Sequence, residues 1–344
     1  MALQSAGNTI SFNDIKNEFG APPENKFGNY RISETVGQLQ NLPLDTGIPQ
    51  TGIISFSNFY SKKQNIIVDL FSGNTEQRVV AKTKYNQDSV VVLGGGDRPD
   101  DTSGKKIIVH VNKTVQSIYS NGTDNKKCAL RTGNWDTGTD FTINVGTNGV
   151  IGGTGGDGGN GGPAGNNNGQ PGDAGTSAIG INDNNLSVSI VNNGAIRAGY
   201  GGGGGGSGRS LNVKVGKKSS QNRTSTGGGG GGGAGIPAPS DGGTASENAN
   251  WENGENGDPG QATQGGDGGA GGEYAGNGGH GGDPSNLVNA GASDERAPSG
   301  TAPGDPTAAI GGESGYAVLR ISGAPAPSLS GNNLVGRNSV GTPT

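Results

Sequence analysis

Residues 152–162 read GGTGGDGGNGG, so two residues in every three lack a side chain and the third is small and polar. The same pattern returns at residues 265–273 (GGDGGAGGE) and 278–283 (GGHGGD), with unbroken glycine runs at 201–206 and 227–233. A period of three residues matches the polyproline II helix, which rises about 3.1 Å per residue. The repeats therefore predict extended helices with glycine on two of three faces.

Such helices are expected to form a bundle. Neighbouring glycine helices can approach closely enough to bond amide to carbonyl, and each hydrogen bond contributes about 1 kcal/mol net. Ordering each residue costs about 1–2 kcal/mol, so an isolated glycine helix is unstable and only one with several neighbours can persist. A flexible linker needs no period of three. It also needs no alternating stretches such as LSVSIVNNGAIRAGY (186–200) and YAVLRISG (316–323), which predict strands that clamp the bundle onto a β domain.

The composition excludes several classes of protein. The 344 residues are 28% hydrophobic and 15% charged, with a net charge of −5. This composition argues against one large core and against a general nucleic-acid binder. Cys128 is the single cysteine, which excludes an intrachain disulfide and a cysteine-based zinc site. No secretion signal or long apolar stretch is present, so we expect a soluble protein without membrane insertion, metal or cofactor.

The chain outside the bundle divides into three parts. In residues 1–63, Ser11 and Asp14 have the spacing of a capping box and predict a short helix, and SETVGQLQNL predicts another from Ser33. Residues 64–147 contain five stretches rich in β-branched residues, which predict a β-sandwich-like domain or a curled sheet. The expected fold is therefore mainly β, with a small N-terminal module at 1–63, the β domain at 64–147, the polyglycine II bundle with inserted strands at 148–322, and a flexible tail at 323–344. The expected core of the N-terminal module is Phe12, Phe56, Phe59 and Tyr60.

Other readings of the glycine repeats fit less well. The start of the calcium-binding nonapeptide pattern GGxGxDxUx is found at Gly152 and at Gly278. The position that should be apolar is Gly159 in the first and Ser285 in the second, so the pattern is not completed. GKKS at 216–219 lacks the spacing of a phosphate-binding loop. An ice-binding bundle would need the same residue types at the third position of successive repeats, and in this chain the residue at that position varies.

Four phrases carry a resemblance to a known group of proteins. They are ISFNDIKNEFG from residue 10, NLPLDTGIPQTGIISFSNFYSKK from 41, HVNKTVQ from 110 and CALRTGNW from 128. Together they resemble virion structural proteins of marine cyanophages and related tailed phages. The glycine-rich half resembles the tail-fibre adhesins of T-even-like phages, and this resemblance implies a rigid polyglycine II platform with receptor-binding loops.

We therefore expect a non-enzymatic tail-fibre or tail-tip adhesin in the virion, made in the host cytoplasm. Residues 1–63 are expected to bind other virion tail proteins, and the glycine-rich head a host polysaccharide or outer-membrane protein. A homo-oligomer, a trimer, is expected through residues 1–147. One alternative is a non-adhesive fibre of neck, head or tail. The other is a glycan-cleaving tailspike, which needs two carboxylates about 5–10 Å apart in a groove. Its candidate acids, Glu247, Glu252, Glu255 and Asp258, lie in a low-complexity segment.

Two segments between glycine runs are the candidate binding loops. Residues 207–226 are basic and residues 236–264 are acidic. Glycine helices cannot hold large side chains between them, so both segments should lie at the ends or edges of the bundle. In one interpretation these segments contact a receptor: the basic side chains bind anionic polysaccharide, and the aromatic rings stack on sugars. In the other, they are solvated loops that pair with each other. The candidate contact residues are Arg209, Lys214, Lys217, Lys218, Arg223, Trp251, Tyr274 and Tyr200.

Overall fold

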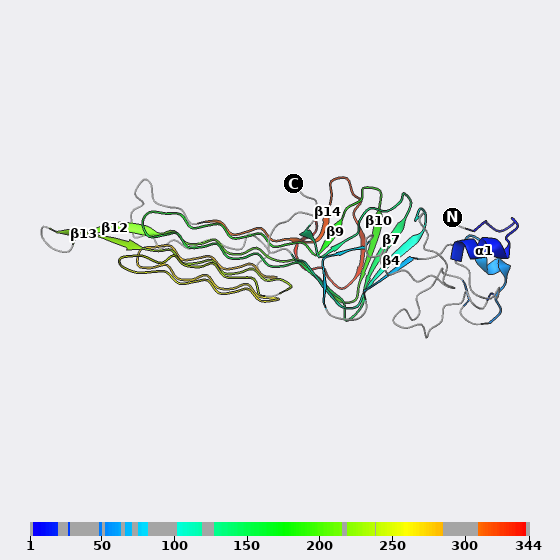
Figure 1. Cartoon of the computed structure of the whole chain (residues 1–344), viewed down its shortest axis with the longest axis horizontal. Helices are drawn as coiled ribbons and strands as arrows, with labels where there is room; N and C mark the ends of the chain where they lie inside the picture. Colours follow the sequence, from blue (N-terminus) through cyan, green and yellow to red (C-terminus); the bar gives the residue numbers. More distant parts are fainter. Residues whose placement is uncertain are drawn as a thin grey trace.

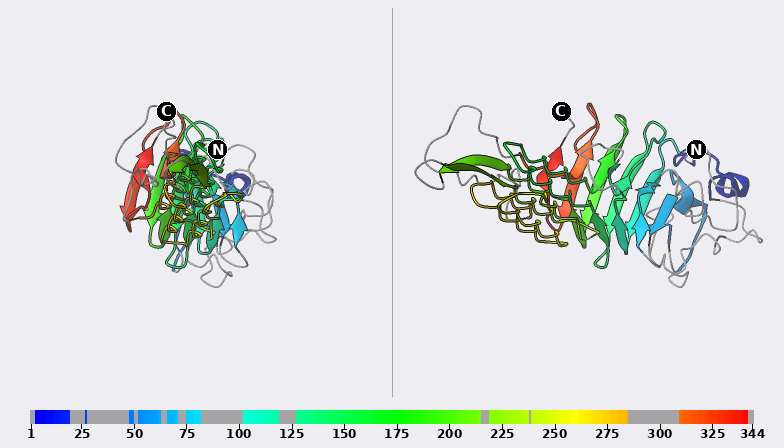
Figure 2. Two further views of the ribbon diagram at one scale, coloured as in Figure 1. Left: turned by 90° about the vertical axis from the view of Figure 1, so that its left-hand side faces the viewer. Right: turned by 60° about the vertical axis from the view of Figure 1, so that its left-hand side comes forward.

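The chain is elongated, with three parts in line (Figure 1). The computed structural model describes residues 3–19, 27, 48–49, 52–62, 66–70, 75–81, 102–118, 127–214, 219–237, 239–284 and 309–341. A small N-terminal module lies at one end, a set of stacked β strands in the middle and the glycine runs at the other end (Figures 1 and 2). No helix in the described part of the chain is long and apolar enough to cross a membrane.

The N-terminal module is built around the capping box that the sequence predicts. Helix α1 (Phe12–Phe19) begins after Ser11, whose amide donates to Asp14 Oδ2 at 2.7 Å, and Asp14 N donates back to Ser11 Oγ at 3.2 Å. A short 3₁₀ helix, η3 (Phe56–Phe59), begins with the same device at Ser55. The expected core is correct for Phe59 and wrong for Phe56, which is 40% exposed, and the predicted helix from Ser33 lies outside the described residues. The buried core consists of Leu3, Ile10, Ile15, Ile48 and Phe59.

The middle of the molecule is a parallel β-solenoid with three faces. From β1 to β11, successive strands along the chain go to successive sheets, and every described pair within these three sheets is parallel. The first sheet contains β1 (Ile66–Leu70), β4 (Lys106–Val111), β7 (Asp140–Val145), β10 (Ser187–Asn192) and β15 (Ser328–Gly331). The second contains β2 (Glu76–Gln77), β5 (Thr114–Gln116), β8 (Val150–Gly152) and β11 (Ala195–Arg197). The third contains β3 (Val79–Val80), β6 (Leu130–Arg131), β9 (Ile179–Ile181), β14 (Tyr316–Arg320) and β16 (Arg337–Gly341).

The solenoid corrects two expectations. The β-sandwich-like domain is wrong, because the strands form three parallel sheets. Parallel neighbours need long crossovers, and here these crossovers run through strands of the other sheets. The flexible tail at 323–344 is also wrong, since β15 and β16 add strands to two faces. Alternate residues of each long strand point inward, so Ile107, Phe141 and Val188 form one buried row across the first sheet.

The glycine runs are two insertions into this solenoid. The first leaves after β8 and returns at β9, and the second leaves after β11 and returns at β14. In the described part of each insertion, the runs lead either outward from the solenoid or back toward it. The outward runs are 153–162, 199–208, 240–247 and 265–272; the returning runs are 167–176, 226–235, 252–260, 276–283 and 309–315.

Backbone hydrogen bonds join these runs with the three-residue period. Gly156, Gly159 and Gly162 donate their amides to Tyr200, Gly203 and Gly206 at 2.7–2.8 Å. Run 199–208 donates in turn to run 226–235, which donates back to run 153–162. Each inner run therefore has several hydrogen-bonded neighbours.

Glycine is required where the runs touch. A Cβ on Gly156 would lie 2.0 Å from the carbonyl oxygen of Asp173, and one on Gly230 would lie 2.1 Å from that of Gly203. Real Cβ atoms do not approach so closely, and the obstacles are backbone atoms. The third residue of each repeat instead faces outward and supplies hydrogen bonds at the edge of the bundle. Side-chain oxygens of Asp157 and Asn160 accept the amides of Asp241 and Thr244 at 2.9 Å.

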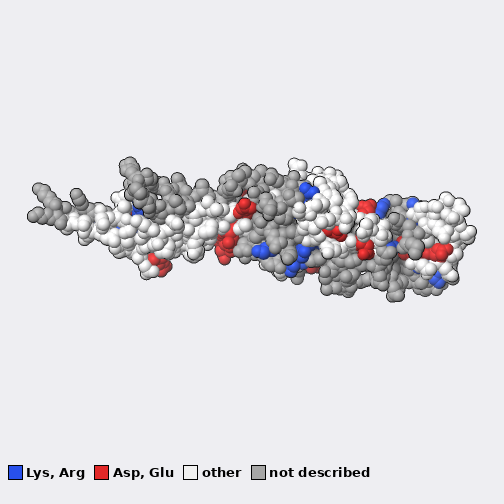
Figure 3. All heavy atoms as spheres, turned by 90° about the horizontal axis from the view of Figure 1, so that it is seen from above, with Lys and Arg blue, Asp and Glu red and all other residues white. Residues whose placement is uncertain are grey.

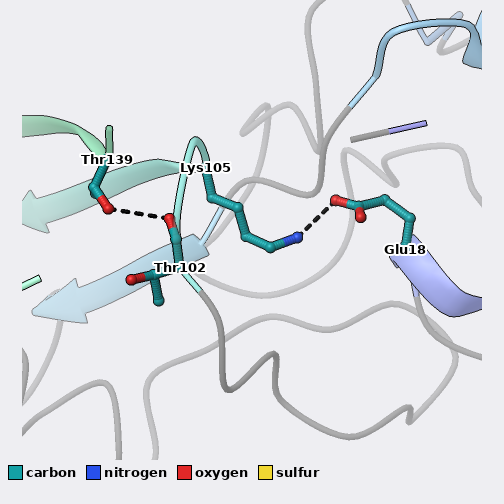
Figure 4. A network of polar contacts seen from close by, with 4 residues as sticks. All are labelled: Glu18, Thr102, Lys105 and Thr139. Carbon is teal, nitrogen blue, oxygen red and sulfur yellow. Dashed lines mark hydrogen bonds and ion pairs between the residues drawn. The ribbon is translucent and has the colours of Figure 1, made fainter. Parts of the chain in front are cut away.

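A buried ion pair joins the N-terminal module to the solenoid. Lys105 Nζ lies 2.6 Å from Glu18 Oε1, and both side chains are 3% exposed (Figure 4). Lys105 immediately precedes β4, and nearby Thr139 donates its hydroxyl to the carbonyl of Thr102 at 3.0 Å. The pair joins the last turn of α1 to the residue that precedes β4 of the solenoid.

Candidate binding site at the distal tip

Because the runs alternate in direction, their outer turns meet at the end of the molecule farthest from the N-terminal module. We call the described residues 163–166, 209–214, 219–225, 248–251 and 273–275 the distal tip. Its largest part is an antiparallel hairpin of β12 (Arg209–Lys214) and β13 (Ser220–Ser225), which projects beyond the glycine runs (Figure 1).

Polar side chains connect the turns of the distal tip. Asn166 Oδ1 accepts the amide of Ser210 at 2.9 Å, which links the first turn to the hairpin. Asn250 links the hairpin to the next turn, since its Nδ2 donates to the carbonyl of Asn222 at 3.0 Å and its Oδ1 accepts the amide of Thr224 at 2.7 Å. The turns therefore form one connected surface.

An aromatic cluster occupies the same surface. The guanidinium carbon of Arg223 lies 3.3 Å from the centroid of the Trp251 ring, a cation–π contact. The indole Nε1–H of Trp251 donates to the carboxylate of Glu273, and Glu273 N donates to Glu252 Oε2 at 2.5 Å. Tyr274, with a left-handed φ of 68°, also hydrogen-bonds to Glu273 through its side chain. Trp251 and Tyr274 are 47% and 39% exposed.

The carboxylate of Glu273 is the electrostatic centre of this cluster. The hydrogen bond from Trp251, followed by that from Tyr274 and the charge of Arg223, lowers the pKa of Glu273 below its ordinary 4.5. The hydrogen bond to Glu273 raises the pKa of the Tyr274 hydroxyl. Each of these groups therefore keeps the charge state that the hydrogen bonds require.

The structure brings together three of the candidate residues: Arg223, Trp251 and Tyr274. Arg209 begins β12 in the same hairpin; Lys214 ends that strand, and Lys217 and Lys218 lie outside the described residues. Charged side chains are sparse along the bundle on the face seen in Figure 3. The contact of Arg223 with the Trp251 ring joins the basic segment to the acidic one through a cation–π contact and not through an ion pair.

The expectation for Tyr200 is wrong. It is 2% exposed and lies at the root of run 199–208, at the opposite end from the tip. Burial, then the charge of Asp283, raises the pKa of Tyr200 to about 12, with Arg197 acting in the opposite direction. Tyr200 is part of the joint between bundle and solenoid and is not accessible to a ligand at the tip.

Sequence reasoning did not identify Glu273 or the connecting side-chain amides of Asn166 and Asn250. The available clue to Glu273 is its position in GGDGGAGGE, where a charged residue ends the glycine repeat. The acids considered for catalysis are exposed, and Glu252, Glu255 and Asp258 follow one another at intervals of three along a single run. Among the described residues, no three His, Cys, Asp or Glu side chains are placed to hold a metal ion.

Comparison with known proteins identifies one family. The sequence profile described as phage tail fibre adhesin Gp38 matches residues 76–339, from β2 to within β16. No curated protein sequence is significantly similar to the chain. Among solved structures, the crystal structure of the gp37-gp38 adhesin tip complex of the bacteriophage S16 long tail fiber is similar, with 17% identity and a TM-score of 0.34. The alignment covers 84% of this chain and 89% of that one.

Proposed function

The chain belongs to the phage tail fibre adhesin Gp38 family, and we propose that it contacts the host cell surface through the distal tip. It is a virion protein of the phage tail, acting as a tail-fibre adhesin. The proposal adds which end of the molecule binds the host and which end is attached to the virion.

One observation carries this proposal: the turns at the far end of the bundle are connected by their side chains. The hydrogen bonds through Asn166, Asn222 and Asn250 hold the surface in place before a ligand arrives. A preorganised surface loses less conformational entropy on binding. The exposed Trp251 and Tyr274 supply contact area of the kind that dominates binding energies.

We further infer that the glycine runs are polyglycine II helices that act as a rigid spacer. The three-residue period of their mutual hydrogen bonds supports this assignment. The spacer places the tip away from the solenoid, so the contact surface can reach a receptor while the remainder stays clear of the envelope.

The opposite end is proposed to attach to the virion. Residues 1–63 lie outside the family match, and their exposed Ile53 and Phe56 offer apolar contacts to another tail protein. The marine cyanophage origin and the homotrimer through residues 1–147 remain predictions, as does synthesis in the host cytoplasm. The described solenoid core closes within one chain, so a trimer would have to form through outer surfaces.

We propose that the protein binds without cleaving its receptor. Two acids at or beside the tip, Glu252 and Glu273, accept hydrogen bonds from the chain's own Glu273 amide and Trp251 indole. A glycosidase needs one carboxylate as an acid and another facing the sugar across a groove. Carboxylates that already accept such bonds favour a binding role.

The test is competition for adsorption. Purified protein should block adsorption of the phage to its host, and the double variant Trp251→Ala/Tyr274→Ala should lose this activity while keeping its thermal midpoint. His280→Ala is the matched control, because its side chain is 73% exposed on the flank of the bundle. If the folded double variant competes as well as the parent, the tip is not the contact surface; if the parent itself does not compete, the non-adhesive fibre is favoured.

A further inference from the structure

We propose that the distal tip binds a neutral pyranose sugar, whose C–H face stacks on the uncovered face of Trp251. This inference rests on the proposed adhesin function and names the class of ligand at the same site.

The indole of Trp251 is held on one face and one edge. Arg223 covers one face with its guanidinium carbon 3.3 Å from the ring centroid, and the Nε1 edge is bound to Glu273. Trp251 is 47% exposed. Because these two sides are occupied, we assign the exposed area to the opposite face and the remaining edge. The result is a flat aromatic platform of fixed orientation.

A second aromatic residue is anchored to the same carboxylate. Tyr274 hydrogen-bonds to Glu273 through its side chain and remains 39% exposed. Aromatic faces carry negative charge density, and the C–H groups on one side of a pyranose ring carry partial positive charge, so the two surfaces attract. One carboxylate thus positions two rings.

The surroundings of the platform suit hydroxyl groups rather than an apolar protein surface. Beside Trp251 lie the amide of Asn250, the hydroxyl of Thr224 and the carboxylate of Glu252, which can exchange hydrogen bonds with a polyol. A protein interface has a core of apolar side chains. Among the described residues of the tip, Trp251 and Tyr274 are the large exposed hydrophobic side chains.

The charges at the platform favour a neutral sugar. Arg223 lies on the covered face of the ring and is near Glu273, whereas Glu252 and Glu273 lie together at its edge. An anionic sugar on the uncovered face would approach two carboxylates. The expected contact between bases and anionic polysaccharide is therefore replaced at Trp251 by a contact with a neutral ring.

The two tryptophans make a direct test possible. Trp135 is 7% exposed, and its Nε1 donates to the carbonyl of Thr132 at 2.8 Å, so its indole N–H resonance is an internal reference. The full chain is titrated with the methyl β-glycosides of glucose, galactose, mannose and N-acetylglucosamine, and with methyl β-glucuronide as the anionic arm. We expect saturable shifts of the Trp251 indole resonance with at least one neutral glycoside, no shift of Trp135, and at least tenfold weaker binding of the glucuronide.

Variants separate this inference from the proposed function. Trp251→Phe should keep glycoside binding in weaker form, detected by shifts of backbone amides in residues 248–251, and Trp251→Ala should abolish it. If no neutral glycoside shifts Trp251 while Trp251→Ala still abolishes competition for adsorption, the sugar assignment is wrong and the tip still binds the host. Binding of the glucuronide alone, or competition by a host envelope protein and by no sugar, also overturns the assignment. If Trp251→Ala competes like the parent, the proposed function fails with it.

Discussion

Arg223 and Trp251 are 28 positions apart in sequence, yet the guanidinium carbon of one lies 3.3 Å from the ring centroid of the other. β13 supplies the arginine, and the turn between two glycine runs supplies the tryptophan. Only the alternation of outward and returning runs brings these positions together. The binding surface is thus a product of the bundle and not of any single loop.

Removing this contact should release the indole. An exposed cation–π contact contributes about 0.5–1 kcal/mol, so Arg223→Ala should weaken competition for adsorption about two- to fivefold without lowering the thermal midpoint. Arg223→Lys keeps the positive charge but loses the planar stacking. Its competition for adsorption should therefore fall between that of the parent and that of Arg223→Ala. Indole N–H spectra provide the check, with Trp251 broadened and Trp135 unchanged. Equal competition by Arg223→Ala would show that the ring needs no such support.

Acid should disorder the aromatic cluster only below the ordinary range of a glutamate. Hydrogen bonds from Trp251 and Tyr274 lower the pKa of Glu273 from 4.5. The order contributed by the ionised carboxylate is therefore fully present above pH 4.5 and is lost as pH falls through the lower value of the folded state. The Trp251 indole resonance should stay constant from pH 7 to 4.5 and change below. In Glu273→Gln this acid transition should be absent; a transition above pH 4.5 in the parent contradicts the assignment.

Adding a side chain to an inner glycine should destabilise the bundle. A Cβ on Gly156 would lie 2.0 Å from the backbone oxygen of Asp173, so Gly156→Val must push two runs apart. Overpacking of this kind costs about 1–3 kcal/mol or more. Ala270→Val is the control, because Ala270 occupies the exposed third position of its repeat. Denaturant unfolding should separate the two variants, and equal stability would count against close contact between the runs.

The close packing of the glycine runs could be predicted from the sequence, because it depends on a local pattern. Glycine at two of three positions leaves each run one outward side chain, and this constraint is legible in GGTGGDGGNGG alone. The solenoid was not predicted because alternation of inward and outward residues is common to sandwiches and solenoids. Its period is also hidden, since the insertions after β8 and β11 separate strands of one coil.

The candidate site could be predicted only in part. Arg223, Trp251 and Tyr274 stand out as large side chains among small ones, and the structure places them together. The same reasoning misplaced Tyr200, because a tyrosine before a glycine run looks exposed unless the joint with the solenoid is known. Glu273 and Asn250 act through partners on other runs, so their roles depend on which runs are neighbours.

Tyr200→Phe should stabilise the protein. The buried hydroxyl of Tyr200 has no hydrogen-bond partner in the described structure, and an unsatisfied buried polar group costs about 1–3 kcal/mol. The gain should grow in alkali, because burial raises the pKa of Tyr200 from 10.0 to about 12. The parent keeps its full stability below pH 10, and it loses stability between pH 10 and pH 12, where the tyrosine ionises in the unfolded chain before it ionises in the folded one. The phenylalanine variant has no such loss. Denaturant unfolding of both proteins at pH 9 and above pH 10 measures the difference. A less stable phenylalanine variant at pH 9 would indicate a partner for the hydroxyl.

The joint between the N-terminal module and the solenoid should depend on both members of its ion pair. Glu18→Gln leaves the ammonium of Lys105 buried without its counter-charge, and loss of one partner of such a pair costs about 3–5 kcal/mol. Replacing both, as Glu18→Leu with Lys105→Met, removes the buried charges together and should restore most of the stability. The asymmetry arises because the penalty comes from the unpaired charge and not from the absent attraction. Protease cleavage between the module and the solenoid, followed with time, should be fast in the single variant and near the parental rate in the double variant. If the double variant is cleaved as fast as the single one, the charges themselves hold the module in place.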